Sequence, residues 1–185
     1  MNRRSALALS GAITGAALLG ALPERSRAGH ANEAPDGAKP YAVFVIRHTE
    51  RLDDSADSEL SGVGRQRADR VGAMLRSAGV LGVLHSETVR TRATGQRILD
   101  ASDTKSGATI RTYDARKPAS MVRGVIEQGS ARGGAWVIVG HSNTVPALVR
   151  AFGGDPGTDE LEHDAYDDLF MVVRAGGVFS LRLRT

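Results

Sequence analysis

The chain of 185 residues is long enough for one domain with a sizeable buried core. Its content of 41% hydrophobic and 24% charged residues is typical of globular proteins, and the lack of cysteine excludes disulfides, thiolate nucleophiles and cysteine metal sites. The pI of about 9.7 comes mainly from residues 1–31, because the rest of the chain carries equal numbers of basic and acidic residues. A dense basic patch is not evident, so we expect no nucleic-acid partner.

The first 31 residues have the layout of a targeting segment. Arg3 and Arg4 precede a charge-free stretch at 6–22 that is rich in Ala, Gly and Leu, which is typical of a secretory signal. The paired arginines are similar to those of a twin-arginine signal. We therefore predict a signal peptide at residues 1–31, a polar linker at 32–40, and export to a bacterial periplasm. A retained N-terminal anchor is the alternative, and it would be the only membrane contact.

Apolar runs and helical spacings alternate along the remainder, residues 41–185, which we predict to be one folded domain. The predicted strands are 41–47, 80–85, 109–113, 135–140, 168–174 and 178–184. The predicted helices run from a cap at Ser61 to about Ala78, from Ser86 to about Ala101, from Pro118 to about Gly129, and from Val145 to Phe152. This order predicts an α/β fold, a three-layer sandwich with a mostly parallel central sheet and an antiparallel edge.

Histidines follow two of the predicted buried strands. Arg47 and His48 end the first strand, and His141 ends the fourth, so we expect them at one edge of the sheet, where ligands collect. Ser142 and Asn143 precede a predicted helix start there, and we expect them to help bind an anion.

A further arginine joins this edge from the second predicted helix. Ser86 stands at the exit of the second strand, and Arg90 lies four residues on, on the same helical face, whereas Arg92 points elsewhere. The N-terminus of that helix offers free N–H groups to an anion. Because guanidinium forks bind phosphoryl oxygens in pairs, this set of residues favours a phosphoryl group as ligand.

Two histidines in such a site suggest phosphoryl transfer in two steps. A neutral imidazole is a competent nucleophile, and nearby positive charge favours the neutral form by lowering the histidine pKa. The second histidine and the arginines can donate to the phosphoryl oxygens, and a carboxylic acid should protonate the leaving alcohol. This scheme requires neither a cofactor nor a metal, and the sequence shows no spacing of further ligands that favours a metal site.

Four segments resemble the motifs of one known superfamily, in the same order. Residues 47–50 resemble its Arg-His-Gly-Glu signature, 60–68 its Leu-Thr-x-x-Gly-x-x-Gln-Ala segment, 86–94 its Ser-x-x-x-Arg-x-x-x-Thr segment, and 139–142 its Val-Gly-His-Gly. The chain is thereby identified as similar to the histidine phosphatase (phosphoglycerate mutase-like) superfamily, and in particular to its small exported members.

The resemblance implies roles for several residues. His48 would be the phosphorylated nucleophile, and Arg47, Arg90 and His141 would line the phosphate pocket. The general acid is left open by the sequence, since Asp114 follows the third predicted strand and Glu87 stands near Arg90.

Some features depart from the family pattern. Thr49 stands where Gly or Ala is more familiar, and a β-branched residue there should narrow the pocket. Little sequence separates the third strand from the third helix, which argues against a large lid domain and against mutase activity on bisphosphoglycerates.

These observations predict a metal-independent phosphatase that acts on a phosphorylated small molecule or phosphoprotein through phosphohistidine. The alternative is a non-catalytic phosphate- or phosphoglycan-binding protein of the same fold. A serine hydrolase is excluded because residues 140–143 lack the Gly-x-Ser-x-Gly elbow. The sequence specifies neither the substrate nor the oligomeric state.

Overall fold

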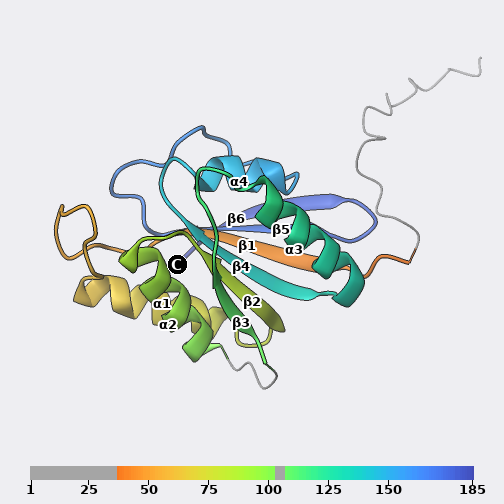
Figure 1. The fold of residues 1–185 in the computed structure, drawn as a ribbon, viewed down its shortest axis with the longest axis horizontal. Coiled ribbons are helices and arrows are strands. Elements are labelled where there is room, and N and C mark those ends of the chain that lie inside the picture. Colours follow the sequence, from red (N-terminus) through yellow and green to blue (C-terminus); the bar gives the residue numbers. More distant parts are fainter. Residues whose placement is uncertain (1–36, 103–106) are drawn as a thin grey trace, which may run out of the picture. The chain divides into compact units, whose positions relative to one another are not determined.

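A six-stranded sheet forms the middle layer of the domain (Figure 1). The computed structural model describes residues 37–102 and 107–185, so the predicted signal peptide and most of the predicted linker lie outside the described residues. In sheet order, the strands are β3 (Thr109–Thr112), β2 (Val80–His85), β4 (Gly134–Gly140), β1 (Tyr41–Arg47), β5 (Asp168–Arg174) and β6 (Val178–Arg184).

The first four strands in this order are parallel, and the last two complete the sheet as an antiparallel hairpin. The prediction of a mostly parallel sheet with an antiparallel edge is therefore confirmed. It follows from the sequence because β1 and β4 are continuous apolar runs, which is typical of strands covered on both faces.

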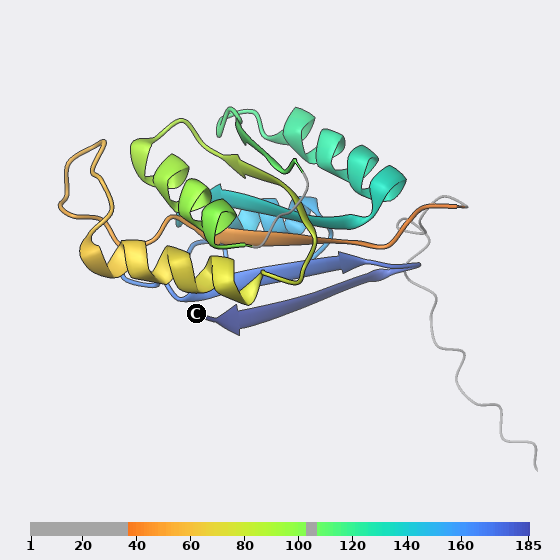
Figure 2. The same cartoon turned by 90° about the horizontal axis from the view of Figure 1, so that it is seen from below.

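Helices cover both faces of the sheet, which confirms the three-layer sandwich (Figure 2). They are α1 (Gly62–Met74), α2 (Val89–Ala101), α3 (Ala119–Arg132) and α4 (Val145–Ala151). Along β1, Phe44 and Ile46 join the core cluster under α1 and α2, while Val43 and Val45 join the cluster under α3 and α4. This alternation fixes which strand residues face which helix pair.

Two helix boundaries differ from the prediction. Helix α1 ends at Met74 rather than Ala78, and the Met74 side chain at its end is 51% exposed. Helix α2 begins at Val89 rather than at Ser86, because the side chain of Thr88 caps it by accepting from the N–H of Thr91. Ser86 is thereby released from the helix and becomes a fully buried residue at the strand end.

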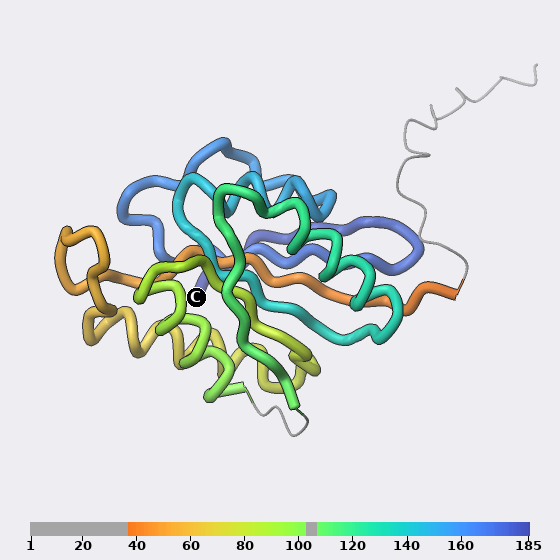
Figure 3. Tube along the Cα trace, in the orientation of Figure 1, coloured from red at the N-terminus to blue at the C-terminus, as the bar shows by residue number. Residues whose placement is uncertain are grey.

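Two long loops lie at the end of the sheet where β1 and β4 finish. Figure 3 shows residues 51–60 and 153–167 at this end, away from the residues that enter β1. The first loop is closed at its base by an isolated antiparallel bridge between Arg51 and Leu60. Within residues 37–102 and 107–185, no helix has the length and apolar character needed to span a membrane.

The close packing of α1 on α2 depends on a glycine. A Cβ added at Gly72 would lie 2.6 Å from both the Ala101 Cβ and the Ile98 carbonyl oxygen, whereas one added at Gly124, in the middle of α3, would meet nothing within 4 Å. We expect Gly72→Ala to lower the free energy of unfolding by about 1–3 kcal/mol through overpacking. Gly124→Ala should raise it by about 1 kcal/mol, since alanine is the better helix former. Urea denaturation of the two variants tests this, and equal effects would contradict the packing account.

Candidate functional site

The pairing of β1 with β4 brings the two predicted histidines together. Arg47 is paired with Gly140 at the ends of the strands, and the His48 N–H donates to the Gly140 carbonyl at 2.9 Å. As a result, the rings of His48 and His141 lie with their centroids 5.4 Å apart, edge to face. The prediction that both histidines lie at the same edge of the sheet is confirmed.

A cavity of about 430 Å³ opens beside these rings. It is lined by six residues that the sequence had indicated, namely Arg47, His48, Arg90, His141, Ser142 and Asn143. Three others, Arg51, Glu160 and His163, complete the lining from the two long loops. We call this cavity the anion pocket, because arginine and histidine side chains dominate it.

The environment of His48 leaves one ring nitrogen available. Its Nδ1 lies 2.9 Å from the Thr49 carbonyl oxygen, which only accepts, so Nδ1 carries the proton and the neutral ring keeps a lone pair on Nε2. Burial lowers the pKa of His48 to about 3, and the nearby charges of Arg47 and Arg90 act in the same direction. At neutral pH this histidine is therefore an uncharged base with a fixed tautomer.

His141 is held by a hydroxyl that sequence reasoning had not assigned to it. Its Nε2 lies 2.7 Å from the Ser86 Oγ, which in turn lies 3.0 Å from the Thr91 Oγ1. Burial lowers the pKa of His141 to about 4, aided by Arg90 and Arg47 and opposed by the charge of Glu87. The serine fixes the orientation of the ring, so that it faces the pocket.

Arg47 joins the end of β1 to the 153–167 loop. Its Nη1 donates to the carbonyl oxygens of Glu162 and His163, both at 2.9 Å, and its guanidinium lies 4.1 Å from the centre of the Tyr166 ring. Burial lowers the pKa of Arg47, and the neighbouring arginines act in the same direction. One edge of this guanidinium is thus used to hold the loop.

Two arginines of the pocket lining each keep a buried donor without a partner among the described residues. Arg90 donates from Nη1 to the Ala56 carbonyl at 2.7 Å, yet the buried Nε atoms of both Arg90 and Arg47 have no hydrogen-bond partner in the part of the chain that the structure describes. A buried donor without a partner is costly. Two of them on cationic groups, beside two neutral histidines, form a site that an oxyanion would satisfy.

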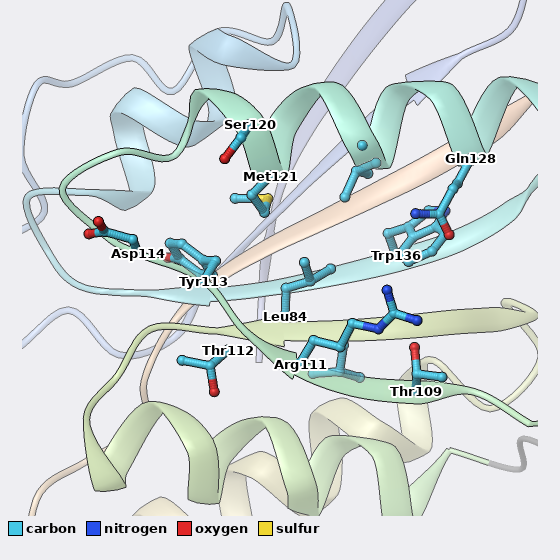
Figure 4. Close-up of a pocket in the computed structure, with 13 residues that line it drawn as sticks. Leu84, Thr109, Arg111, Thr112, Tyr113, Asp114, Ser120, Met121, Gln128 and Trp136 are labelled. Atoms are coloured by element: carbon cyan, nitrogen blue, oxygen red, sulfur yellow. The ribbon is translucent and has the colours of Figure 1, made fainter.

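The structure separates the two candidates for the general acid. Asp114 does not reach the anion pocket. It lies at one end of another cavity, of about 380 Å³, between β3 and α3 (Figure 4). Its carboxylate accepts from the Arg116 N–H at 2.8 Å, as in a turn. The Glu87 carboxylate accepts from the Ala115 N–H at 3.3 Å and is close enough to His141 to raise its pKa. Glu87 is therefore the better placed of the two.

Two further expectations about the pocket are wrong. Thr49 does not narrow it, because its side chain is fully buried and its hydroxyl lies 3.2 Å from that of Thr94 on α2. The start of α2 does not present all its N–H groups to the pocket either, since the Val89 N–H donates to the Asp57 carboxylate at 2.9 Å. A residue from the 51–60 loop thus takes a donor that was expected to bind the anion.

The sequence reasoning also missed contributors from the loops. Arg51 lies three residues after His48 in a polar stretch, which was its only signal, and Tyr166 is in ring contact with both Arg47 and His48. His163, in the 153–167 loop, is exposed and also lines the anion pocket. Among the residues that the structure describes, no group of three or more His, Asp or Glu side chains is arranged to hold a metal ion.

Comparison with known proteins agrees with this geometry. The model of the histidine phosphatase superfamily (branch 1) matches residues 43–115, which include Arg47, His48 and Arg90. The fold is also that of a phosphoglycerate mutase from Bacillus anthracis str. Sterne, with a TM-score of 0.57 and 13% identity over 80% of this chain and 94% of that one. Over residues 43–115 the chain is thus similar to the histidine phosphatase superfamily, and its fold agrees with that similarity.

Two further proteins to which the chain is similar carry different names. The protein histidine phosphatase SixA, solved with tungstate, has a TM-score of 0.58 and 18% identity, covering 77% of this chain and 96% of that chain. A curated relative from Erwinia tasmaniensis, named "Probable phosphoglycerate mutase GpmB", is 36% identical over 66 residues, which are 32% of this chain and 31% of that protein. The match thus spans about a third of that relative. The family match over residues 43–115 supports a phosphatase- or mutase-type function.

The lowered pKa of His48 predicts a pH-dependent stability. Above about pH 6.5, its ordinary pKa, the ring is neutral in both the folded and the unfolded chain. As the pH falls from there toward about 3, only the unfolded chain binds the proton, so the folded state loses stability. We expect the unfolding free energy of the natural chain to fall more steeply than that of His48→Gln, by about 1.4 kcal/mol per pH unit below pH 6. Urea denaturation between pH 4.5 and 7.5 measures this, and parallel curves would contradict it.

Proposed function

We propose that the protein hydrolyses phosphomonoesters through a covalent phosphohistidine on His48. The observation that carries the proposal is the neutral His48 ring, fixed by Thr49 at Nδ1, in a pocket lined by Arg47 and Arg90, whose buried Nε–H groups have no partner among the described residues. A nucleophile with a free lone pair beside donors for the phosphoryl oxygens is what two-step phosphoryl transfer requires.

In the first step, the Nε2 lone pair of His48 attacks phosphorus and the P–O bond to the leaving alcohol breaks. The ring gains positive charge, which strengthens the hydrogen bond from its Nδ1–H to the Thr49 carbonyl. Arg47 and Arg90 donate to the equatorial oxygens, where the charge of the transition state is spread.

His141 completes the set of donors. A bound dianion raises the pKa of a nearby histidine, so the ring of His141 takes up a proton when substrate enters the pocket. An imidazolium donates from both nitrogens. Ser86 accepts from Nε2, and the other nitrogen then donates to the phosphoryl group.

Glu87 serves as the proton donor to the leaving alkoxide and then as the base for the attacking water. In the second step this water breaks the P–N bond, its proton passes to the Glu87 carboxylate, and orthophosphate leaves with His48 restored to its neutral form. The proximity of Glu87 to His141 supports this role, as does its anchorage to the Ala115 N–H.

The solved neighbours support an oxyanion ligand of this kind. The protein histidine phosphatase in that comparison was solved with tungstate, a tetrahedral analogue of phosphate, and another neighbour, a mycobacterial glucosyl-3-phosphoglycerate phosphatase, shares the fold with a TM-score of 0.56 at 12% identity over 78% of this chain and 97% of that chain. For this chain we infer a phosphorylated small molecule or phosphoprotein as substrate. From the leader sequence we also infer that it acts after export.

Turnover of 4-nitrophenyl phosphate by the full chain tests the proposal. We expect release of nitrophenol that is unchanged by EDTA and absent in His48→Ala. Arg90→Gln should lower kcat/KM by about 10²–10³-fold, the typical effect of removing one transition-state donor. Arg92→Gln is the matched control, because Arg92 is exposed on the same helix and does not line the pocket, and it should leave kcat/KM unchanged.

Labelling with a ³²P-phosphomonoester identifies the intermediate. A phosphohistidine is stable in alkali and labile in acid, so the label should survive alkaline quenching and be absent from His48→Ala. Binding of phosphate without turnover by the natural chain would instead establish the non-catalytic alternative. Equal turnover by His48→Ala would contradict the proposed nucleophile.

The assignment of the acid has its own test. Glu87→Gln should lower kcat for alkyl phosphates by about 10²-fold or more, because their leaving alkoxides need a proton. For 4-nitrophenyl phosphate, whose leaving group is already stable as an anion, it should change the rate of the first step little, measured as the burst of nitrophenol, and should lower the steady-state kcat only through the second step, where Glu87 is the base for water. Asp114→Asn, measured on the same two substrates, should change neither. The reverse pattern would give the role to Asp114.

A further inference from the structure

Three arginines line the anion pocket, namely Arg47, Arg51 and Arg90. Arg47 and Arg90 both line it, each with a buried Nε–H that has no partner among the residues that the structure describes, and the rings of His48 and His141 lie beside them. Arg51 lines the same pocket from the 51–60 loop. The cavity of about 430 Å³ is also far larger than a phosphoryl group, so part of the leaving group lies inside it.

The backbone fixes Arg51 in place. The residue sits at the base of the 51–60 loop, where it forms a bridge to Leu60, and the next N–H, of Leu52, donates to the Glu59 carbonyl at 2.9 Å. The base of this loop continues directly from β1 through His48. The backbone of Arg51 is thus held by hydrogen bonds at the base of the loop.

The partners of the Arg51 guanidinium can be exchanged for a ligand. Its Nη2 donates to the Asp54 carboxylate at 2.6 Å, but that side chain is 92% exposed, and its contact with the His163 Nε2 is longer, at 3.3 Å. Ion pairs with an exposed carboxylate contribute little, because water competes for both charges. An anionic group held inside the pocket would replace Asp54 at small cost.

The positive charges of three arginines also lie close together in the anion pocket. The charge of Arg51 acts on both Arg47 and Arg90 strongly enough to lower the pKa of each, after the larger effect of burial. Three guanidinium groups that repel one another are stabilised together by a ligand with more negative charge than one phosphoryl group.

We propose, on the basis of the proposed function, that Arg51 binds a second anionic group on the leaving portion of the substrate. The substrate class is then a phosphomonoester that carries a carboxylate or a second phosphoryl group. Arg51 acts as a specificity-determining residue, since it touches the substrate at a distance from the reacting phosphorus.

Binding to a His48→Ala background tests this without turnover. Three homologous series are compared by calorimetry over increasing chain length: ω-hydroxyalkyl phosphates, ω-carboxyalkyl phosphates and alkanediol bisphosphates. At the best chain length, we expect a carboxylate or a second phosphoryl group to lower Kd by about tenfold relative to the hydroxyl compound, as for a charge-assisted hydrogen bond. The series with the larger gain identifies the anionic group.

Variants separate ligand binding from a structural role. Arg51→Gln should weaken binding of the carboxyalkyl phosphate and the bisphosphate more than binding of the hydroxyalkyl phosphate, so that the preference is lost, and Arg92→Gln, which removes the same charge elsewhere on the domain, should preserve it. Asp54→Asn should keep or increase the preference, because it removes the competing carboxylate, whereas a purely structural ion pair would make Asp54→Asn and Arg51→Gln alike.

Three results would overturn the inference: no preference in either anionic series, an equal loss for all three series in Arg51→Gln, or matching behaviour of Arg51→Gln and Asp54→Asn. Failure of the proposed function is distinguishable from these. If the proposed function fails, the natural chain turns over none of the compounds, although binding still shows a preference that depends on Arg51. That result would leave a binding site for a doubly anionic ligand.

Discussion

The register between β1 and β4 is the constraint on which the rest of the site depends. Because Arg47 pairs with Gly140, the next residue on each strand is a histidine, and the His48 N–H extends the ladder by one more bond to the Gly140 carbonyl. The strands are buried on both faces by the two core clusters, so a slip of one residue would invert every apolar side chain. The core thus enforces the distance between the two imidazoles.

Around this pair lie the guanidinium groups of Arg47, which is buried, and of Arg90, which is half-buried. Burial alone would make such a site unstable. The structure limits the cost in two ways: the histidines stay neutral, and the guanidinium groups of Arg47 and Arg90 donate to backbone carbonyls of the flanking loops. The same contacts tie both loops to the pocket, so the residues that bind the anion also organise the walls around it.

The sequence predicted the fold and the strand-end residues because these follow from local patterns. Continuous apolar runs identify buried parallel strands, and the residue after each run necessarily lies at the sheet edge, which is how His48 and His141 were found. The signal for α2 was less specific, since Ser86 and Thr88 are both good caps, and only the tertiary structure shows that Ser86 stays with the strand and bonds to His141.

Long-range contacts account for what the sequence did not show. No local pattern indicates that the 153–167 loop returns its carbonyls to Arg47, or that Asp57 caps the Val89 N–H across the chain. Asp114 illustrates the same limit: it follows a strand, as expected of a site residue, yet β3 is the edge strand, separated from β4 by β2, and its end opens into a different cavity. Position along the sheet, which the sequence leaves open, decides which strand ends meet.

The central claim is that two imidazoles and two guanidinium Nε–H groups face one tetrahedral anion. A crystal structure of the full chain with vanadate tests it most directly. The account predicts vanadium bonded to the Nε2 of His48, with its oxygens within hydrogen-bond distance of His141 and of the Nε atoms of Arg47 and Arg90. Vanadate bound only in the cavity beside Asp114, or bound in the anion pocket with the His48 Nε2 turned away from it, would contradict the account.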